Sequence, residues 1–260
     1  MQDRDRKKNR NNGSKKYGRD NRVKAAKGKG SAASRVPRKT MRPQTDAKHE
    51  TPRARKKTEV KPGPMLYPLP PVMVSCGTMD ESNILTVAWT GIVNSDPPMT
   101  YISVRKSRYS HHIIEERKEF VINLTSRELT KACDLCGVRS GHDMDKFEAA
   151  GLTKEVASHV DAPMIAESPI SLECVVKGVT ELPSHDMFLA EIVAVHIDEE
   201  LISEEGRYKV EDMDLVSYCH GEYLPVGRMP LGFFGYSIMK PKTRKKLNRQ
   251  GHGNRRRQRG

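Results

Sequence analysis

Short apolar runs, separated by turn residues, dominate the middle of the chain. These runs are rich in Val, Ile, Leu and aromatic side chains, a composition typical of β-strands. We therefore predict strands over residues 72–76, 83–89, 99–105, 120–123, 170–179 and 188–197.

Turn and capping residues between these runs predict where the chain reverses and where helices begin. Asp96-Pro97-Pro98 predicts a turn between the second and third strands. Three helices are expected: one over 111–118 with Ser110 as its N-cap, one that follows a capping box at 125–128 and ends at Gly137, and one over 143–150 that ends at Gly151. Because the helices follow the third strand instead of alternating with strands throughout, the pattern favours a mainly β barrel with inserted helices over a doubly wound parallel sheet.

Charge divides the chain of 260 residues into three parts. Residues 1–62 hold 22 Lys and Arg against 6 Asp and Glu, and residues 240–260 hold 10 Lys and Arg and no acidic residue. The remainder, 63–239, carries 14 basic and 27 acidic residues. The two basic segments have too few large apolar side chains to offset the entropy of ordering, so we predict a disordered arm at 1–62, one domain at 63–239 and a disordered tail at 240–260.

Several classes of protein are disfavoured by what the sequence lacks. No apolar run approaches the roughly 18 residues that a membrane-spanning helix needs, so no membrane association is expected. The first residues are charged, unlike a secretory signal. Five widely spread cysteines do not suggest a disulfide framework. We therefore expect reduced thiols and a cytoplasmic location.

Residues 83–110 carry the most informative candidate chemistry. Short hydroxyl and amide side chains lie at predicted strand ends and turns, beside Arg105, Lys106 and Arg108. Polar donors, free backbone N–H groups and a nearby cation are what a bound phosphate needs. The alternative is an ordinary turn with a solvated basic patch.

An ordered series of motifs resembles one known family. The series includes Ala88-Trp89-Thr90, Asp96-Pro97-Pro98, Glu119-Phe-Val-Ile-Asn123, Cys133-Asp-Leu-Cys136-Gly137, Asp145-Lys146-Phe147 and Ser184-His-Asp-Met-Phe188. Together they are similar to the flavin reductase-like family, the FMN-binding split β-barrels that include flavoredoxin. The resemblance covers about residues 65–235 and neither basic segment.

This resemblance implies an FMN held without a covalent bond by a homodimer, with a site at each subunit interface. Thr86, Ala88, Trp89 and Thr90 would line the isoalloxazine, Asn94 and Ser95 would lie near the ring or ribityl chain, and Ser103, Arg105, Lys106, Ser107 and Ser110 would contact the phosphate.

Two further residues have a functional and a structural interpretation. By the same resemblance His185 is the catalytic candidate, which would position a nicotinamide or a substrate, or donate a proton near reduced flavin; the alternative is a structural histidine. Lys146 would reach the flavin of the paired subunit, or would be a solvated helix cation.

The Cys133 and Cys136 pair has three interpretations. A zinc site needs about four ligands, and only His142 follows at a usable distance, so no metal is expected. A redox pair needs an exposed thiolate, typically at a helix N-terminus. Because this pair lies near the predicted end of a helix, buried or half-buried thiols are favoured.

The resemblance thus implies an FMN-dependent oxidoreductase that passes electrons from NADH, NADPH or a redox protein to an unidentified acceptor. No dinucleotide-binding fingerprint is present, so a nicotinamide would bind only transiently over the flavin. The alternative is a nucleic-acid-associated protein, bound non-specifically through its basic segments, with the barrel as a scaffold. A cofactor carrier without turnover, and tails that only solubilise or fold back on the acidic domain, are also open.

Overall fold

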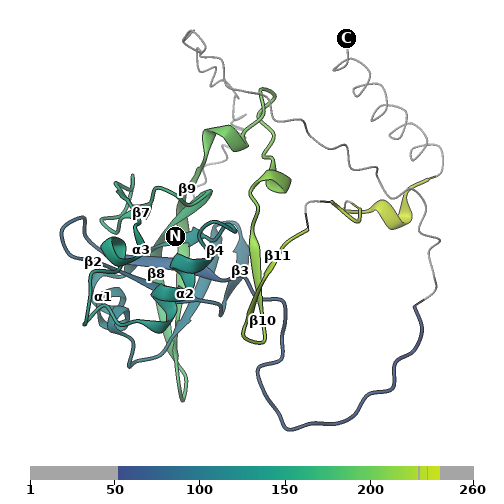
Figure 1. Cartoon of the computed structure of the whole chain (residues 1–260), viewed down its shortest axis with the longest axis horizontal. Helices are drawn as coiled ribbons and strands as arrows, with labels where there is room; N and C mark the ends of the chain where they lie inside the picture. Colours follow the sequence, from purple (N-terminus) through teal and green to yellow (C-terminus); the bar gives the residue numbers. More distant parts are fainter. Residues whose placement is uncertain (1–51, 228, 233, 241–260) are drawn as a thin grey trace, which may run out of the picture. The chain divides into compact units, whose positions relative to one another are not determined.

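The predicted strands pair with one another in a single antiparallel sheet. The structure, a computed structural model, describes residues 52–227, 229–232 and 234–240. Seven strands pair in the order β2-β1-β5-β8-β9-β4-β3. Figure 1 draws them as arrows in the part of the chain that is coloured from blue to green. They are β1 Val72–Gly77, β2 Ser82–Val87, β3 Thr90–Ser95, β4 Pro98–Val104, β5 Glu119–Leu124, β8 Ile170–Glu181 and β9 Asp186–Ile197. The mainly β prediction is confirmed.

Helices and two small hairpins interrupt and follow this sheet. The α-helices are α1 Tyr109–Arg117, α2 Thr130–Val138 and α3 Lys146–Ala150, and single 3-10 turns cover Glu199–Leu201, Val210–Asp212 and Tyr236–Ile238. Strands β6 Lys154–Glu155 and β7 Met164–Ile165 form one small sheet, and β10 Val216–Cys219 and β11 Glu222–Pro225 form another. None of the described helices is long and apolar enough to cross a bilayer.

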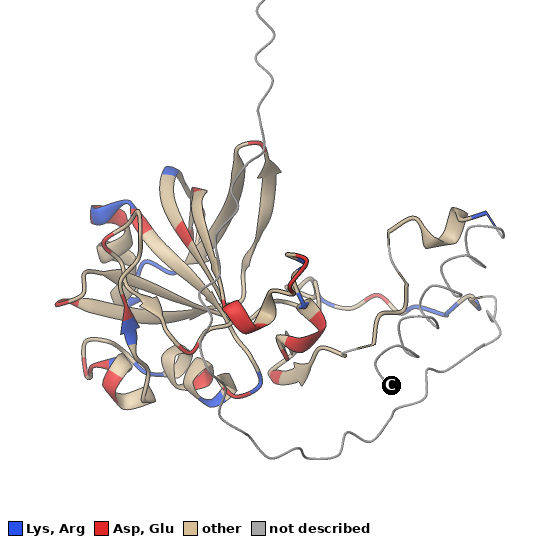
Figure 2. Cartoon of the chain, turned by 90° about the horizontal axis from the view of Figure 1, so that it is seen from above, with Lys and Arg blue, Asp and Glu red and all other residues tan. Residues whose placement is uncertain are grey.

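Contacts divide the chain into two units, Met1–Val60 and Lys61–Gly260. Of the first unit, residues 52–60 are described, and they form no helix or strand. The predicted disorder of 1–51 and 241–260 lies outside the described residues. In the second unit, acidic side chains are spread widely over the described ribbon (Figure 2).

Strand β1 is buried along its whole length because its two faces meet different apolar clusters. Val74 packs in the cluster that holds the fully buried rings of Phe120 and Phe188. Met73, one residue earlier, packs in the cluster under α2 and α3 with Phe147. Side chains of a strand point alternately to opposite faces, so burial on both sides explains why residues 72–76 read as a continuous apolar run.

Strand β3 and the first helix differ from the prediction. Strand β3 was missed because Gly, Asn and Ser interrupt the apolar pattern of its sequence, TGIVNS, and its last four residues are exposed. Helix α1 begins at Tyr109 with Arg108 as N-cap and no side-chain cap, so the prediction that Ser110 is the N-cap is wrong. Ser110 lies inside the first turn, and its hydroxyl accepts a hydrogen bond from Asn83 Nδ2 at 2.7 Å.

The predicted boundaries of the second helix are also wrong. Helix α2 begins at Thr130, after the expected capping box, because Ser126 forms a bridge with Leu215 and the chain turns before the helix starts. Gly137 lies within the helix and does not end it. A Cβ at Gly137 would lie 3.2 Å from Cβ of Thr86, so the glycine allows α2 to lie close against β2. The end of α3 at Gly151, in a left-handed conformation, is confirmed.

Candidate functional site

A pocket of about 140 Å³ lies where β2 and β4 end and β9 begins. The end of β4 and the start of β9 meet because these two strands pair in a register that places Val104 opposite Asp186. The pocket is lined by Leu85, Thr86, Val87, Ala88, Trp89, Ser103, Val104, Arg105, Arg108 and His185.

Two rings form one wall of this pocket. The centroids of Trp89 and His185 are 4.6 Å apart and their planes are inclined at 39°. Backbone N–H of Ser103 donates to the carbonyl of Trp89 at 2.9 Å, which fixes the chain as it leaves β2. Nδ1 of His185 lies 2.9 Å from the hydroxyl of Ser184. Trp89 is 40% exposed, so part of the indole faces solvent.

Two guanidinium groups form the other wall. Arg105 and Arg108 are exposed and joined by a turn in which Arg108 N–H donates to the carbonyl of Arg105 at 3.0 Å. Neither forms an ion pair with another residue in the described part of the chain. Burial, and then the positive charges of Arg105 and Arg108, lower the pKa of His185. The imidazole is therefore neutral at pH 7. The positive charge that can bind an anion at this site is carried by Arg105 and Arg108.

The structure brings together about half of the residues predicted from the sequence. Those that line the pocket are Thr86, Ala88, Trp89, Ser103, Arg105 and His185. Those that do not are Thr90, Asn94, Ser95, Lys106, Ser107, Ser110 and Lys146. The hydroxyl of Thr90 donates to the backbone carbonyl of Tyr101 at 2.6 Å, and the side-chain amide of Asn94 donates to the backbone carbonyl of Pro97 at 2.8 Å. Both hydrogen bonds therefore support the β3–β4 hairpin. Their predicted contacts with a flavin stay predictions.

Lys146 is buried, so the interpretation as a solvated cation is wrong. Its side chain is 3% exposed, and Nζ donates to the carbonyls of Ile84 and Cys136, each at 2.8 Å. Burial lowers the pKa of this ammonium group. Lys146 thus ties α3 to β2 and α2, and a contact with a flavin stays a prediction.

Lys106 is also engaged outside the pocket. Its ammonium lies 2.9 Å from Glu181 Oε2 and 3.6 Å from Asp186 Oδ1. From the sequence, Arg108 was identified only as one of three cations in its segment. In the structure, Arg108 lines the pocket and Lys106 does not. The spacing of three residues between Arg105 and Arg108 could have indicated this, because a tight turn brings two residues at that spacing to the same side of the chain.

The two cysteines of α2 are buried free thiols, as favoured from the sequence. Burial raises the pKa of Cys136 to about 11, and burial also raises the pKa of Cys133. Neither is a thiolate at pH 7, so this pair lacks the form that thiol redox chemistry requires.

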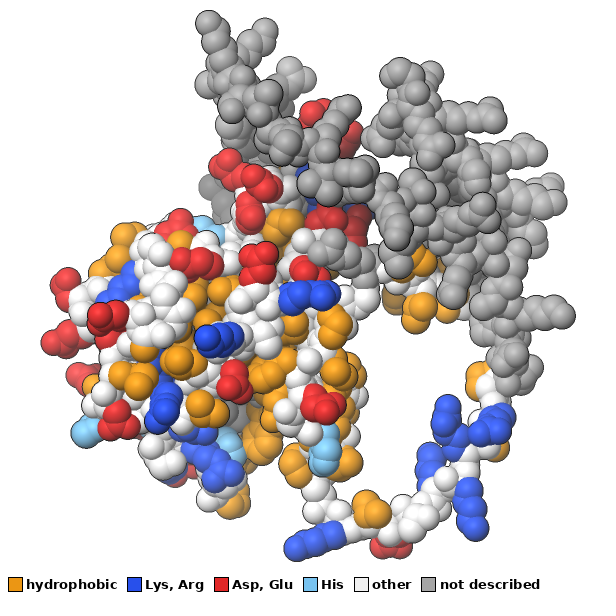
Figure 3. Space-filling view, viewed as in Figure 1, with side chains coloured by type: hydrophobic (Ala, Val, Ile, Leu, Met, Phe, Trp, Pro, Cys, Tyr) orange, Lys and Arg blue, Asp and Glu red, His pale blue; other side chains and the backbone are white. Residues whose placement is uncertain are grey.

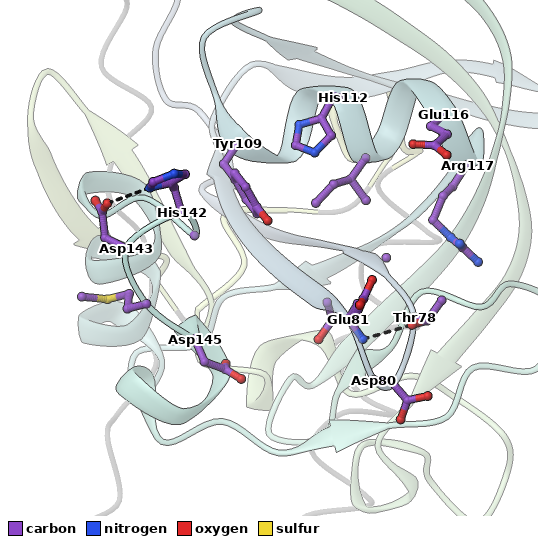
Figure 4. Close-up of a pocket in the computed structure, with 15 residues that line it drawn as sticks. Thr78, Asp80, Glu81, Tyr109, His112, Glu116, Arg117, His142, Asp143 and Asp145 are labelled. Carbon is purple, nitrogen blue, oxygen red and sulfur yellow. Dashed lines mark hydrogen bonds and ion pairs between the residues drawn. The ribbon is translucent and has the colours of Figure 1, made fainter.

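A larger pocket of about 770 Å³ lies between the β1–β2 turn, α1 and residues 141–145 (Figure 4). Carboxylates line it: Asp80, Glu81, Glu116, Asp143 and Asp145. Its single arginine, Arg117, is paired with Asp161 at 2.7 Å. Such a lining repels phosphate, so the smaller pocket with two free arginines is the better match for a phosphorylated ligand.

Comparison with known proteins identifies the family. Residues 65–226 match the flavin reductase like domain, and the chain belongs to that family. The structure is similar to flavoredoxin of Desulfovibrio vulgaris (Miyazaki F), with 32% identity and a TM-score of 0.65 over 70% of this chain and 100% of that chain. It is also similar to flavoredoxin from Methanosarcina acetivorans, with 27% identity and a TM-score of 0.64 over 71% of this chain and 100% of that chain.

Two further relatives extend this picture. The 2-nitrobenzoate 2-nitroreductase of Pseudomonas fluorescens is 26% identical, with a TM-score of 0.59 over 66% of this chain and 87% of that chain. An uncharacterized protein of Archaeoglobus fulgidus is 32% identical over 130 residues, which are 50% of this chain and 73% of that protein. The chain therefore has the split-barrel fold of flavin-binding oxidoreductases.

Proposed function

We propose that this chain is an FMN-dependent oxidoreductase whose flavin binds in the pocket formed by Trp89, His185, Arg105 and Arg108. The observation that carries the proposal is the pairing of flat rings with two free guanidinium groups in one pocket. Planar rings suit an isoalloxazine face, and arginine binds phosphate through two parallel hydrogen bonds.

Each residue has a distinct role in this proposal. Arg105 and Arg108 hold the phosphate, and Trp89 limits the access of water to the ring. His185 is neutral because its pKa is lowered, and Ser184 holds its Nδ1. Its Nε2 is then the atom that holds or releases a proton beside the cofactor. When bound, FMN supplies the redox chemistry.

We propose a homodimer, because the pocket of one chain is too small for the cofactor. Its volume of about 140 Å³ is below the about 300 to 1,000 Å³ of ordinary ligand sites. The edge strand β3, which follows Trp89, exposes Ile92 by 69% and Val93 by 51%. A second copy on this strand would cover these side chains and supply the missing wall. Light scattering should give twice the chain mass for the parent protein and the mass of a single chain for Ile92→Glu.

The electron donor is NADH, NADPH or a redox protein, and the electrons pass through FMN to an acceptor. The test is an absorption spectrum of the protein loaded with FMN, before and after anaerobic addition of NADH or NADPH. Loss of the visible flavin bands supports a nicotinamide donor. Flavin bands that persist point to a redox protein as donor. A protein that stays colourless after incubation with FMN contradicts the proposal.

A second candidate function rests on the segregation of charge. Arg53, Arg55, Lys56, Lys57 and Lys61 are exposed on a stretch without helix or strand. Figure 3 shows where Lys and Arg side chains, in blue, lie on the visible face. The acidic domain would repel a polyanion, so non-specific nucleic-acid binding would depend on the basic segments. Affinity for single-stranded RNA should then fall steeply with salt, with a slope of about −0.7 per phosphate contacted. Affinity that does not change with salt would contradict this candidate.

A further inference from the structure

Two buried carboxylates in the sheet each contact a histidine, and one of these pairs lies beside the candidate flavin site. Asp186, the first residue of β9, is 2% exposed, and its Oδ2 lies 2.8 Å from Nε2 of His111 in α1, which is 6% exposed. The other pair, Glu173 and His196, joins β8 to β9 at a distance of 2.5 Å.

Asp186 connects the two segments that carry the walls of the pocket. Its Oδ1 lies 3.6 Å from Nζ of Lys106, in the turn between β4 and α1. Lys106 and His111 lie on either side of Arg108 in the sequence, and Asp186 directly follows His185. One carboxylate therefore holds the segment of the guanidinium groups against the segment of the catalytic candidate.

The pair is poorly explained as a source of stability alone. Replacing two buried polar partners by apolar side chains of similar shape is often nearly neutral or stabilising. Moreover, Oδ1 of Asp186 has no hydrogen bond within the described residues, and 3.6 Å from Lys106 is too long for one. Burying a carboxylate oxygen without a hydrogen bond costs free energy. We therefore explain Asp186 by the orientation that it imposes on its neighbours in the pocket, as residues behind the ligand-contacting side chains do at other sites.

We propose that Asp186 and His111 are positioning residues, which hold Arg105, Arg108 and His185 in the arrangement that binds the flavin. Neither residue lines the pocket itself. The ring of His111 also lies 5.3 Å from that of Phe188, two residues farther along β9, so α1 is fixed to the strand by a hydrogen bond and by packing. The proposal rests on the proposed function for its ligand, but the positions of the apo side chains are independent of it.

The experiment compares Asp186→Asn with Glu173→Gln, a matched change in the other carboxylate–histidine pair. Both variants replace a buried carboxyl group by an amide, and both should unfold at a lower temperature than the parent. At a temperature where all three proteins are folded, Asp186→Asn should weaken FMN binding about tenfold, whereas Glu173→Gln should bind FMN like the parent. Equal affinities in the two variants would overturn the proposal.

Fluorescence of the only tryptophan separates this result from failure of the proposed function. Trp89 contacts the ring of His185, so displacement of His185 changes the emission of the apo protein. Asp186→Asn should alter this emission and Glu173→Gln should not. If the parent does not bind FMN, the proposed function is wrong, and the emission still decides whether Asp186 positions His185.

A second pair of variants guards against loss of folding. His111→Leu removes the donor to Asp186, whereas His111→Gln keeps an N–H near the position of Nε2. The glutamine variant should recover the parent's Trp89 emission and FMN affinity, and the leucine variant should show the defects of Asp186→Asn. If leucine and glutamine behave alike, the hydrogen bond does not position the site.

Discussion

Glu173→Gln should destabilise the fold more than the substitution of any exposed carboxylate. Glu173 is fully buried on β8, and its two oxygens accept backbone N–H bonds from Ser158 at 2.8 Å, His159 at 2.6 Å and Val160 at 3.0 Å. His196 Nε2 lies 2.5 Å from Oε1. This one carboxylate therefore holds the loop after β6 against the sheet.

The size of the effect follows from these contacts. A glutamine can keep its oxygen toward His159 and Val160, but it then turns an NH2 group toward the N–H of Ser158. An unsatisfied buried donor costs about 1 to 3 kcal/mol, and loss of charge weakens the remaining bonds. We expect a total near 3 kcal/mol, which corresponds to a fall in melting temperature of about 6 to 12 °C for a domain of this size.

The pH dependence gives a second test of the same contacts. Burial alone would raise the pKa of Glu173, but the hydrogen bonds from Ser158, His196 and His159, together with the charge of His196, outweigh burial, and the pKa is lowered from 4.5. Because the pKa of Glu173 is lower in the folded state, the unfolded state binds more protons than the folded state as the pH falls below 4.5. The stability that Glu173 contributes is therefore present above that pH and is lost as the pH falls through the folded pKa. The gap in melting temperature between parent and variant should narrow in acid.

The assay is thermal unfolding followed by circular dichroism, from neutral pH down to the acid limit of the folded state. Glu205→Gln is the control, because Glu205 is exposed and should leave the melting temperature unchanged. A melting temperature of Glu173→Gln equal to that of the control would refute the reasoning. A gap that widens in acid would refute the assigned direction of the pKa.

Three further predictions concern the site, the backbone and the thiols. Replacing either Arg105 or Arg108 by Gln should weaken FMN binding about 10- to 100-fold, measured by titration; an unchanged affinity would show that the phosphate is bound elsewhere. Gly77→Ala should abolish soluble expression or strongly lower the melting temperature, because φ is +96° and the new Cβ would lie 2.1 Å from a backbone oxygen; normal stability would contradict this geometry. Cys219, which is half-buried, should be alkylated at pH 8 before Cys136, whose pKa burial raises to about 11, and mass spectrometry would show the order.

Most strands could be predicted from the sequence because a buried strand has an apolar local composition. Residues 170–179 and 188–197 are long runs rich in Val, Ile and Leu, and they form β8 and β9 with similar bounds. Strand β3 was missed because a half-exposed edge strand does not need an apolar sequence. What it needs is a partner, and β4 supplies one.

The missed positions in the site depend on contacts between distant residues. Ser110 has a side chain typical of an N-cap, but its hydroxyl instead accepts a hydrogen bond from Asn83, which lies 27 positions earlier in the sequence. Lys146 resembles a solvated helix cation in sequence, but carbonyls of β2 and α2 hold it in the interior. Neither contact leaves a local pattern. The cluster of Arg105, Trp89 and His185 was found only because the family resemblance supplied the long-range pairing.

A fluorescence titration of the full chain with FMN tests the central claim most directly. The chain has one tryptophan, and that residue forms a wall of the pocket to which the flavin is assigned. The account predicts that FMN quenches Trp89 emission in a saturable way and that the Arg105→Gln variant needs more FMN to reach the same quenching. Binding of FMN that leaves Trp89 emission unchanged, or no binding at all, would contradict it.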